Sequence, residues 1–101
     1  MNKVLGILGL AMRARALAVG TNSVLESVRK GKALLVLIAS DASSNTQKQL
    51  TDKASYRQVP VQTLPFDMLE LGHALGKDHT VAVAVEQEGF VISYTKACSA
   101  K

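Results

Sequence analysis

Apolar positions along the chain alternate between a helical spacing and the spacing of buried strands. Val4, Ile7, Leu8 and Ala11 recur three or four positions apart, as in an amphipathic helix. Residues 33–39 are apolar at every position, which is typical of a central strand covered on both faces. From the same pattern we expect helices over residues 2–14, 21–30, 45–56 and 66–75 and a short final helix within 88–96, and strands over 16–19, 33–39, 59–64 and 80–85.

Local signals set the expected ends of several elements. Gly31 should end the second helix, and Ser44 with Gln47 fits a capping box that starts the third. Pro60 directs the third strand to an edge or a strand start, because proline has no N–H to donate to a neighbouring strand. Pro65 suits the first turn of the fourth helix.

Helices and strands alternate throughout, which predicts an α/β fold with helices on both sides of a sheet. The length of 101 residues suits one domain. We expect this domain to cover residues 1–96, with residues 97–101 as a loose tail. Gly6 and Gly9 fall inside the first helix, where each glycine costs about 1 kcal/mol. We therefore expect both glycines to allow a neighbouring element to approach closely.

Positive charge is concentrated in the first part of the chain. Residues 1–57 hold nine Lys/Arg and three Asp/Glu, a formal charge of +6, whereas residues 58–101 have a formal charge of −2. This asymmetry suggests a basic surface that faces a polyanion; a basic surface that is merely solvated is the alternative. The chain has two Tyr, two Phe and no Trp, too few for a platform on which single-stranded bases stack. An RNA partner would therefore be recognised by its folded shape.

The sequence lacks the usual chemistry of enzymes and metal sites. The segment RKGKALL has neither the earlier glycine nor the Ser/Thr of a phosphate-binding loop, and His73 and His79 lack the spacing of metal ligands. Asp41 follows a central strand, where α/β proteins often bind ligands, but Asp41, Ser43 and Ser44 also fit a turn and a helix cap. We favour the capping role and expect no cofactor, no metal and no small-molecule substrate.

Two features bear on where the protein resides. Lys3, a short apolar run and the Ala-Arg-Ala of residues 14–16 loosely imitate a secretory signal, but the helical spacing of the run favours a first helix of the folded domain. No stretch is long enough to span a membrane. The single cysteine, Cys98, cannot form an intrachain disulfide, which fits a reducing cytoplasm. We expect a cytoplasmic protein without a membrane partner.

The second predicted helix has an apolar side and a polar side. At about 100° per residue, Val24, Leu25 and Val28 cluster on one side. The opposite side carries Asn22, Ser23, Glu26, Arg29 and Lys30. The helix is thus expected to bury one side and to present amides, hydroxyls and charges on the other.

Polar residues at the start of this helix suit two roles. A helix N-terminus presents unpaired N–H groups and partial positive charge, which suit phosphate, and the Asn22 amide could read a base edge. Capping is the alternative for Thr21 and Asn22, and Ser23 with Glu26 fits an S-x-x-E capping box. The residues alone leave both roles open.

Four motifs follow one another along the chain: the G-x-N that opens the second helix, GKALLVLIASDAS with NT and K after it, the VPV strand, and ELG-A-GK. Over about residues 4–92 this order resembles the L-seven-Ae-type ribosomal protein family, and its small bacterial members most of all. The resemblance implies a three-layer α-β-α sandwich around a mixed four-stranded sheet. It also implies binding of kink-turn or related structured RNA in ribosomal or other ribonucleoprotein settings.

In such proteins the tip of the second helix enters the RNA groove at tandem sheared G·A pairs, and a loop before the last strand covers a protruding nucleotide. By this resemblance, Gly20 would let the backbone approach the RNA, Asn22 would read a base and Lys30 would contact phosphate. Residues 77–80 match the covering loop. The sequence departs from the best-known RNA binders at two helix positions, where Ser23 replaces Glu and Glu26 replaces Lys, and in the covering loop, where GKDHT is polar and theirs is more apolar.

We therefore predict a non-enzymatic protein that binds structured, kink-turn-like RNA, with ribosomal RNA as one candidate and ribosomal or ribonucleoprotein partners. The predicted RNA contacts are Gly20, Thr21, Asn22, Ser23, Arg29, Lys30 and Lys32, with Arg13 and Arg15 from the neighbouring loop and Lys77 and His79 from the covering loop. A protein–protein adaptor on the same fold is the alternative, since Ser23 and Glu26 depart from the RNA-binding pattern. A small-molecule enzyme that uses Asp41 is the third hypothesis.

Overall fold

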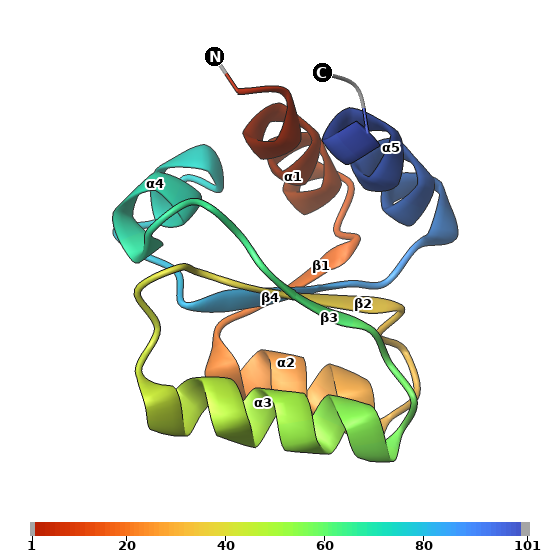
Figure 1. Ribbon diagram of the computed structural model, residues 1–101. Helices are drawn as coiled ribbons and strands as arrows, with labels where there is room; N and C mark the ends of the chain where they lie inside the picture. The colour runs from red at the N-terminus through yellow and green to blue at the C-terminus, as the bar shows by residue number, and fades with distance from the viewer. Residues whose placement is uncertain (1, 100–101) are drawn as a thin grey trace.

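The computed structural model describes residues 2–99. The elements follow in the order α1 (Lys3–Arg13), β1 (Leu17–Val19), α2 (Thr21–Arg29), β2 (Leu35–Ile38), α3 (Ser44–Tyr56), β3 (Val61–Thr63), α4 (Met68–Ala74), β4 (Ala82–Val85) and α5 (Glu88–Ser99). Helices and strands alternate as the hydrophobic pattern predicts, and Figure 1 shows this order along the chain.

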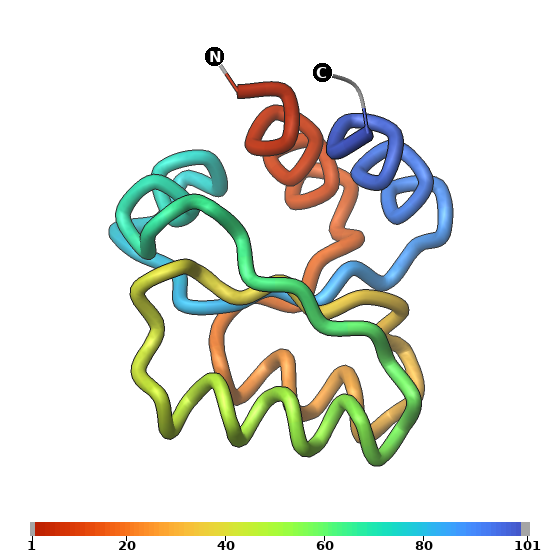
Figure 2. The backbone as a smooth tube through the Cα atoms, in the orientation of Figure 1, coloured from red at the N-terminus to blue at the C-terminus, as the bar shows by residue number. Residues whose placement is uncertain are grey.

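The strands form one mixed sheet in the order β1-β4-β2-β3. β4 is antiparallel to both of its neighbours, β1 and β2, whereas β2 and β3 are parallel. Helices α2 and α3 cover one face of the sheet, and α1, α4 and α5 cover the other (Figure 1). The first and last helices, α1 and α5, lie side by side in the same layer (Figure 2). The predicted three-layer α-β-α sandwich around a mixed four-stranded sheet is confirmed.

The apolar run of β2 explains the two-sided core. Successive side chains of a strand point to opposite faces, and every residue of β2 is buried. Leu35 and Leu37 belong to the core under α1, α4 and α5, whereas Val36 and Ile38 belong to the core under α2 and α3. A strand in the middle of two cores has to be apolar at each position, and this is the pattern that the sequence shows.

The third helix begins one residue earlier than predicted. Ser43 is the N-cap of α3, and its Oγ accepts a hydrogen bond from Thr46 N at 3.2 Å. Ser44 is already the first helical residue, and Gln47 Nε2 donates to the carbonyl of Ala42 instead. The predicted box of Ser44 and Gln47 is therefore wrong, because the extended backbone that a cap requires falls at Ser43.

The fourth helix begins two residues later than predicted. Asp67 caps α4 in a complete capping box, in which Asp67 Oδ1 accepts from Glu70 N at 2.8 Å and Glu70 Oε1 accepts from Asp67 N at 3.2 Å. Pro65 thus lies in the turn before the helix and not in its first turn. The paired hydrogen bonds of the box fix the start of the helix more strongly than the φ preference of a proline does.

The final helix is longer than predicted. α5 runs through Ser99, so residues 97–99 are helical and not part of a loose tail; residues 100 and 101 lie outside the described residues. Buried Tyr94 fixes this helix on the sheet, because its hydroxyl donates to Gln62 Oε1 at 2.7 Å.

Close packing of glycines holds for Gly9 but not for Gly6. A Cβ on Gly9 would lie 3.0 Å from the carbonyl oxygen of Ala74, so this glycine lets α4 approach α1. A Cβ on Gly6 would meet no described atom within 4 Å. Gly72 on α4, which the sequence did not single out for packing, is the tightest of these positions, because its Cβ would lie 2.5 Å from His79 Cα.

Candidate nucleic-acid interface

The start of α2 is formed by a glycine in a conformation that other residues rarely adopt. Gly20 has φ 94° and ψ 158° and is the N-cap of α2. Its N–H donates to the carbonyl of Ala82 at 2.9 Å, which ties the helix start to β4. A positive φ favours glycine because it has no Cβ, so the chain turns from β1 into α2 within one residue.

The tip of α2 is left without a side-chain cap. Among residues 2–99, side chains cap α1, α3 and α4 through Asn2, Ser43 and Asp67, but none caps α2. The S-x-x-E capping box of Ser23 and Glu26 is therefore wrong: Ser23 is the third residue of the helix, too far inside it to serve as its cap. The first N–H groups of α2 are free to meet an acceptor outside the chain.

The two sides of α2 are arranged as the helical wheel predicts. Val24 and Val28 are fully buried, and Leu25 is half-buried. Asn22 and Ser23 are exposed at the tip, whereas Thr21 and Gly20 are half-buried. The amide and hydroxyl predicted to read RNA thus lie together on one accessible end of the helix.

The predicted covering loop lies near the same end of the sheet. The segment between α4 and β4 leads directly into Ala82, which accepts from Gly20 N at the start of α2. Exposed His79 packs its backbone against Gly72. Exposed Lys77 lines a separate hollow beside Leu69, on the side of α4. The backbone of the loop is therefore near the α2 tip, while the Lys77 side chain belongs to the α4 surface.

An open hollow of about 430 Å³ runs along the flank of α2, and we call it the α2 groove. It is lined by Asn22, Ser23, Glu26, Ser27, Lys30, Lys32 and Glu86. It joins the tip of the helix to two of the predicted phosphate contacts, Lys30 and Lys32. Its two carboxylates and two ammonium groups balance one another, so the groove is polar without being strongly basic.

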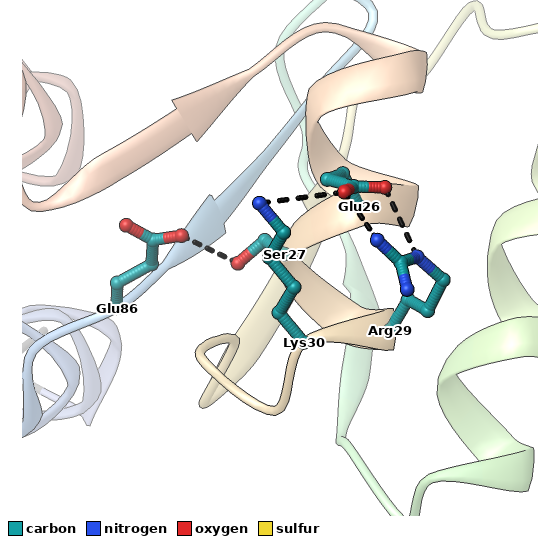
Figure 3. Close-up of polar contacts among 5 residues, drawn as sticks. All are labelled: Glu26, Ser27, Arg29, Lys30 and Glu86. Carbon is teal, nitrogen blue, oxygen red and sulfur yellow. Dashed lines mark hydrogen bonds and ion pairs between the residues drawn. The ribbon is translucent and has the colours of Figure 1, made fainter.

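Glu26 holds two of the predicted phosphate-contacting cations (Figure 3). Its carboxylate accepts from Arg29 Nε at 3.1 Å and from Arg29 Nη2 at 2.5 Å, and it lies 3.4 Å from Lys30 Nζ. Hydrogen bonds from Arg29 hold the pKa of the Glu26 carboxyl below its ordinary value, with the charges of Arg29 and Lys30 acting in the same direction. Glu26 is therefore ionised at neutral pH.

Ser27 and Glu86 are groove residues that the sequence reasoning missed. The Ser27 side chain is almost fully buried, and its Oγ donates to Glu86 Oε2 at 2.5 Å. Glu86 follows β4 directly, and Figure 3 shows its carboxylate reaching from that strand end to α2. The two residues are 59 positions apart, so the only available signal was a serine among buried positions of the helix.

Arg13 and Arg15 do not join the α2 tip. Arg15, with φ 58°, precedes β1, whereas Gly20 follows it; five residues of nearly extended chain span about 16 Å. Arg13 lines a different hollow on the opposite face of the sheet, between α1 and α4. The two arginines were expected in a neighbouring loop because they are close in sequence, but a whole strand separates them from the tip.

One carboxylate oxygen of Asp41, the alternative ligand site, is used for a contact within the protein. Asp41 Oδ1 accepts from the backbone N–H of Met68 at 2.9 Å. The carboxylate thus ties the turn after β2 to the first residue of α4, rather than capping α3. Among residues 2–99, no three His, Cys, Asp or Glu side chains group as metal ligands, and no helix is long and apolar enough to cross a membrane.

With the fold and the site described, the chain can be compared with known proteins. A model of the ribosomal protein L7Ae/L30e/S12e/Gadd45 family matches residues 2–93. The chain therefore belongs to this family, as the resemblance predicted. The family is non-enzymatic, so the prediction that the chain is not an enzyme is confirmed.

The chain is also similar to individual proteins of known sequence or structure. The RNA-binding protein YlxQ of Bacillus subtilis is 44% identical over 84 residues, which are 83% of this chain and 83% of YlxQ. A solved structure of a protein of unknown function from Bacillus halodurans is 36% identical, with a TM-score of 0.90 over 98% of this chain and 99% of that one. A 15.5-kD RNA-binding protein of Giardia lamblia superposes with a TM-score of 0.78 over 96% of this chain and 82% of that one; at 21% identity, this likeness concerns the fold.

Proposed function

We propose that this protein binds structured, kink-turn-like RNA as a non-enzymatic, cytoplasmic component of a ribosomal or other ribonucleoprotein particle. Family membership supports RNA as the partner, and a relative of similar length is named an RNA-binding protein. The α2 tip and the α2 groove are the proposed contact surface.

The uncapped start of α2 carries this proposal. Side chains cap α1, α3 and α4, but the start of α2 has only Gly20, and exposed Asn22 and Ser23 stand beside its open N–H groups. Open N–H groups and the helix dipole favour an RNA phosphate at this point. The Asn22 amide supplies both a donor and an acceptor to a base edge.

Basic side chains extend the contact away from the tip. Lys32 lines the α2 groove and, among residues 2–99, makes no ion pair within 4 Å. We assign Lys32 the most direct phosphate contact, with Lys30 and Arg29 reaching phosphate once they leave Glu26. Thr21 and Ser23 are proposed to contact sugar or phosphate, and His79 to line the covering loop.

The test compares two asparagines at the same helical position. Asn22 is the second residue of α2, and Asn45 is the second residue of α3; both are exposed. Asn22→Ala should weaken binding of a kink-turn duplex by about 1–3 kcal/mol and reduce the protein's preference for the kink-turn over a fully paired duplex. Asn45→Ala should change neither the affinity nor this preference. Gel-shift titration measures both values. Equal losses in the two variants would contradict the assignment of the α2 tip.

A second candidate function is a protein–protein adaptor. The hollow between α1 and α4 has a volume of about 600 Å³ and is lined by Leu5, Leu10 and Ala74 among others, and Leu10 is 58% exposed. Leu5, Leu10 and Ala74 give this hollow a contiguous apolar part, and a contiguous apolar surface is the kind of feature that a protein partner covers. Affinity capture with and without ribonuclease separates the two functions, because partners of an adaptor survive the digestion.

A further inference from the structure

Glu26 lies between the two cations that the proposed interface would offer to RNA phosphates. Arg29 is one turn and Lys30 just over one turn further along α2, and both contact the Glu26 carboxylate. All three side chains are about half exposed, so solvent and RNA can reach them. Figure 3 shows Arg29 and Lys30 converging on this carboxylate from two sides. Neither cation is free as it stands.

We propose that Glu26 is a specificity-determining residue of the RNA interface, because it holds Arg29 and Lys30 in ion pairs that an RNA phosphate has to displace. This inference rests on the proposed function. A phosphate offers only negative charge and acceptor oxygens, so it can take the cations but cannot replace them as partners of Glu26. Base amino groups and 2′-hydroxyls can donate to the carboxylate that is left.

The ion pairs of Glu26 therefore lower affinity most for nucleic acids that contact this surface through phosphates alone. Non-specific binding to nucleic acid comes almost entirely from phosphates, so the ion pairs of Glu26 weaken it in full. An RNA whose shape brings a base edge or a 2′-hydroxyl to Glu26 recovers part of the loss. Glu26 thus lowers affinity for every duplex but raises the preference for the RNA that fits.

Glu86 allows ion pairing to be separated from general negative charge. It is the second carboxylate of the α2 groove, it accepts from Ser27, and among residues 2–99 it has no cation within 4 Å. Glu86→Gln removes a negative charge from the same groove but releases no cation. Asp52→Asn removes one from an exposed position on α3. The three variants therefore have the same net charge.

The experiment measures dissociation constants of the wild-type protein and of Glu26→Gln, Glu86→Gln and Asp52→Asn for a kink-turn duplex and a fully paired duplex across a salt series. An exposed ion pair changes an equilibrium constant by about 1.4- to fivefold. Releasing two cations should thus tighten binding of the paired duplex by about two- to twenty-fivefold relative to Asp52→Asn. The slope of log K against log salt should steepen by about 1–2, and the preference for the kink-turn should fall.

Four outcomes are distinguished by this experiment. A larger effect of Glu26→Gln than of both controls, with a lower kink-turn preference, supports the proposal. Equal effects of Glu26→Gln and Glu86→Gln overturn it, because charge in the groove would then act without ion pairing. If the wild-type protein binds neither duplex, the proposed function itself fails; if it binds and Asn22→Ala weakens it while Glu26→Gln matches Asp52→Asn, only the role of Glu26 fails. Thermal unfolding of each variant confirms that it is folded.

Discussion

Replacing Gly72 with alanine should destabilise the protein although alanine is the better helix former. Gly72 is buried in α4, directly against the backbone of His79. A Cβ at this position would lie 2.5 Å from His79 Cα and 2.8 Å from both His79 N and His79 C. These neighbours are backbone atoms, so no rotation of a side chain can relieve the clash.

The expected magnitude follows from two opposing terms. Forcing a methyl group into a packed site costs about 1–3 kcal/mol, and three backbone atoms at such short range place Gly72 at the upper end. Alanine recovers about 1 kcal/mol of helix propensity. The net loss in the free energy of unfolding is thus about 2 kcal/mol, which lowers the melting temperature of a domain of this size by about 10 °C.

Gly6→Ala is the matched control, because a Cβ on Gly6 meets no described atom within 4 Å. It should stabilise α1 by about 1 kcal/mol, so the two glycine-to-alanine changes should have opposite signs. Urea unfolding followed by circular dichroism measures both. If Gly72→Ala were as stable as the wild type, the tight contact with His79 would be refuted. RNA binding gives a second readout, since only Gly72→Ala should move the covering loop.

Two further predictions concern caps and titration. Ser43→Ala should cost about 1 kcal/mol, because Ser43 caps α3, whereas Ser44→Ala should cost little; equal losses in urea unfolding would speak against this cap. Burial, helped by the nearby Cys98 thiol, raises the pKa of Tyr94 above its ordinary value of 10.0. The unfolded chain therefore ionises this phenol first, so its contribution to stability is complete below about pH 10 and is lost as the pH rises further. Tyr94→Phe should reduce the loss of stability at alkaline pH, whereas Tyr56→Phe, at a residue 82% exposed, should not. Unfolding curves from pH 8 to about pH 11 measure this loss. An equally steep loss of stability in the two variants would show that the reasoning is wrong.

The sequence determined the layers of the fold and the two sides of α2. The periodicity of hydrophobic residues indicates which face of an element is buried. It predicted that β2 lies at the centre of the sheet and that Val24 and Val28 pack against the sheet. The motif order also identified the family. Both signals depend only on the order of residues along the chain, so they can be recognised without the tertiary structure.

Only the tertiary structure decided which polar side chains meet. In the folded chain Ser27 donates a hydrogen bond to Glu86, and Asp41 accepts one from the first residue of α4, although the partners are far apart in sequence. It also placed Arg13 on the far face of the sheet from the α2 tip, although the two are close in sequence. The physical reason is that a hydrogen bond or an ion pair depends on positions within a few ångströms, which are fixed by how the elements pack. The periodicity of hydrophobic residues determines which face of each element is buried, but it does not determine which other element packs against that face.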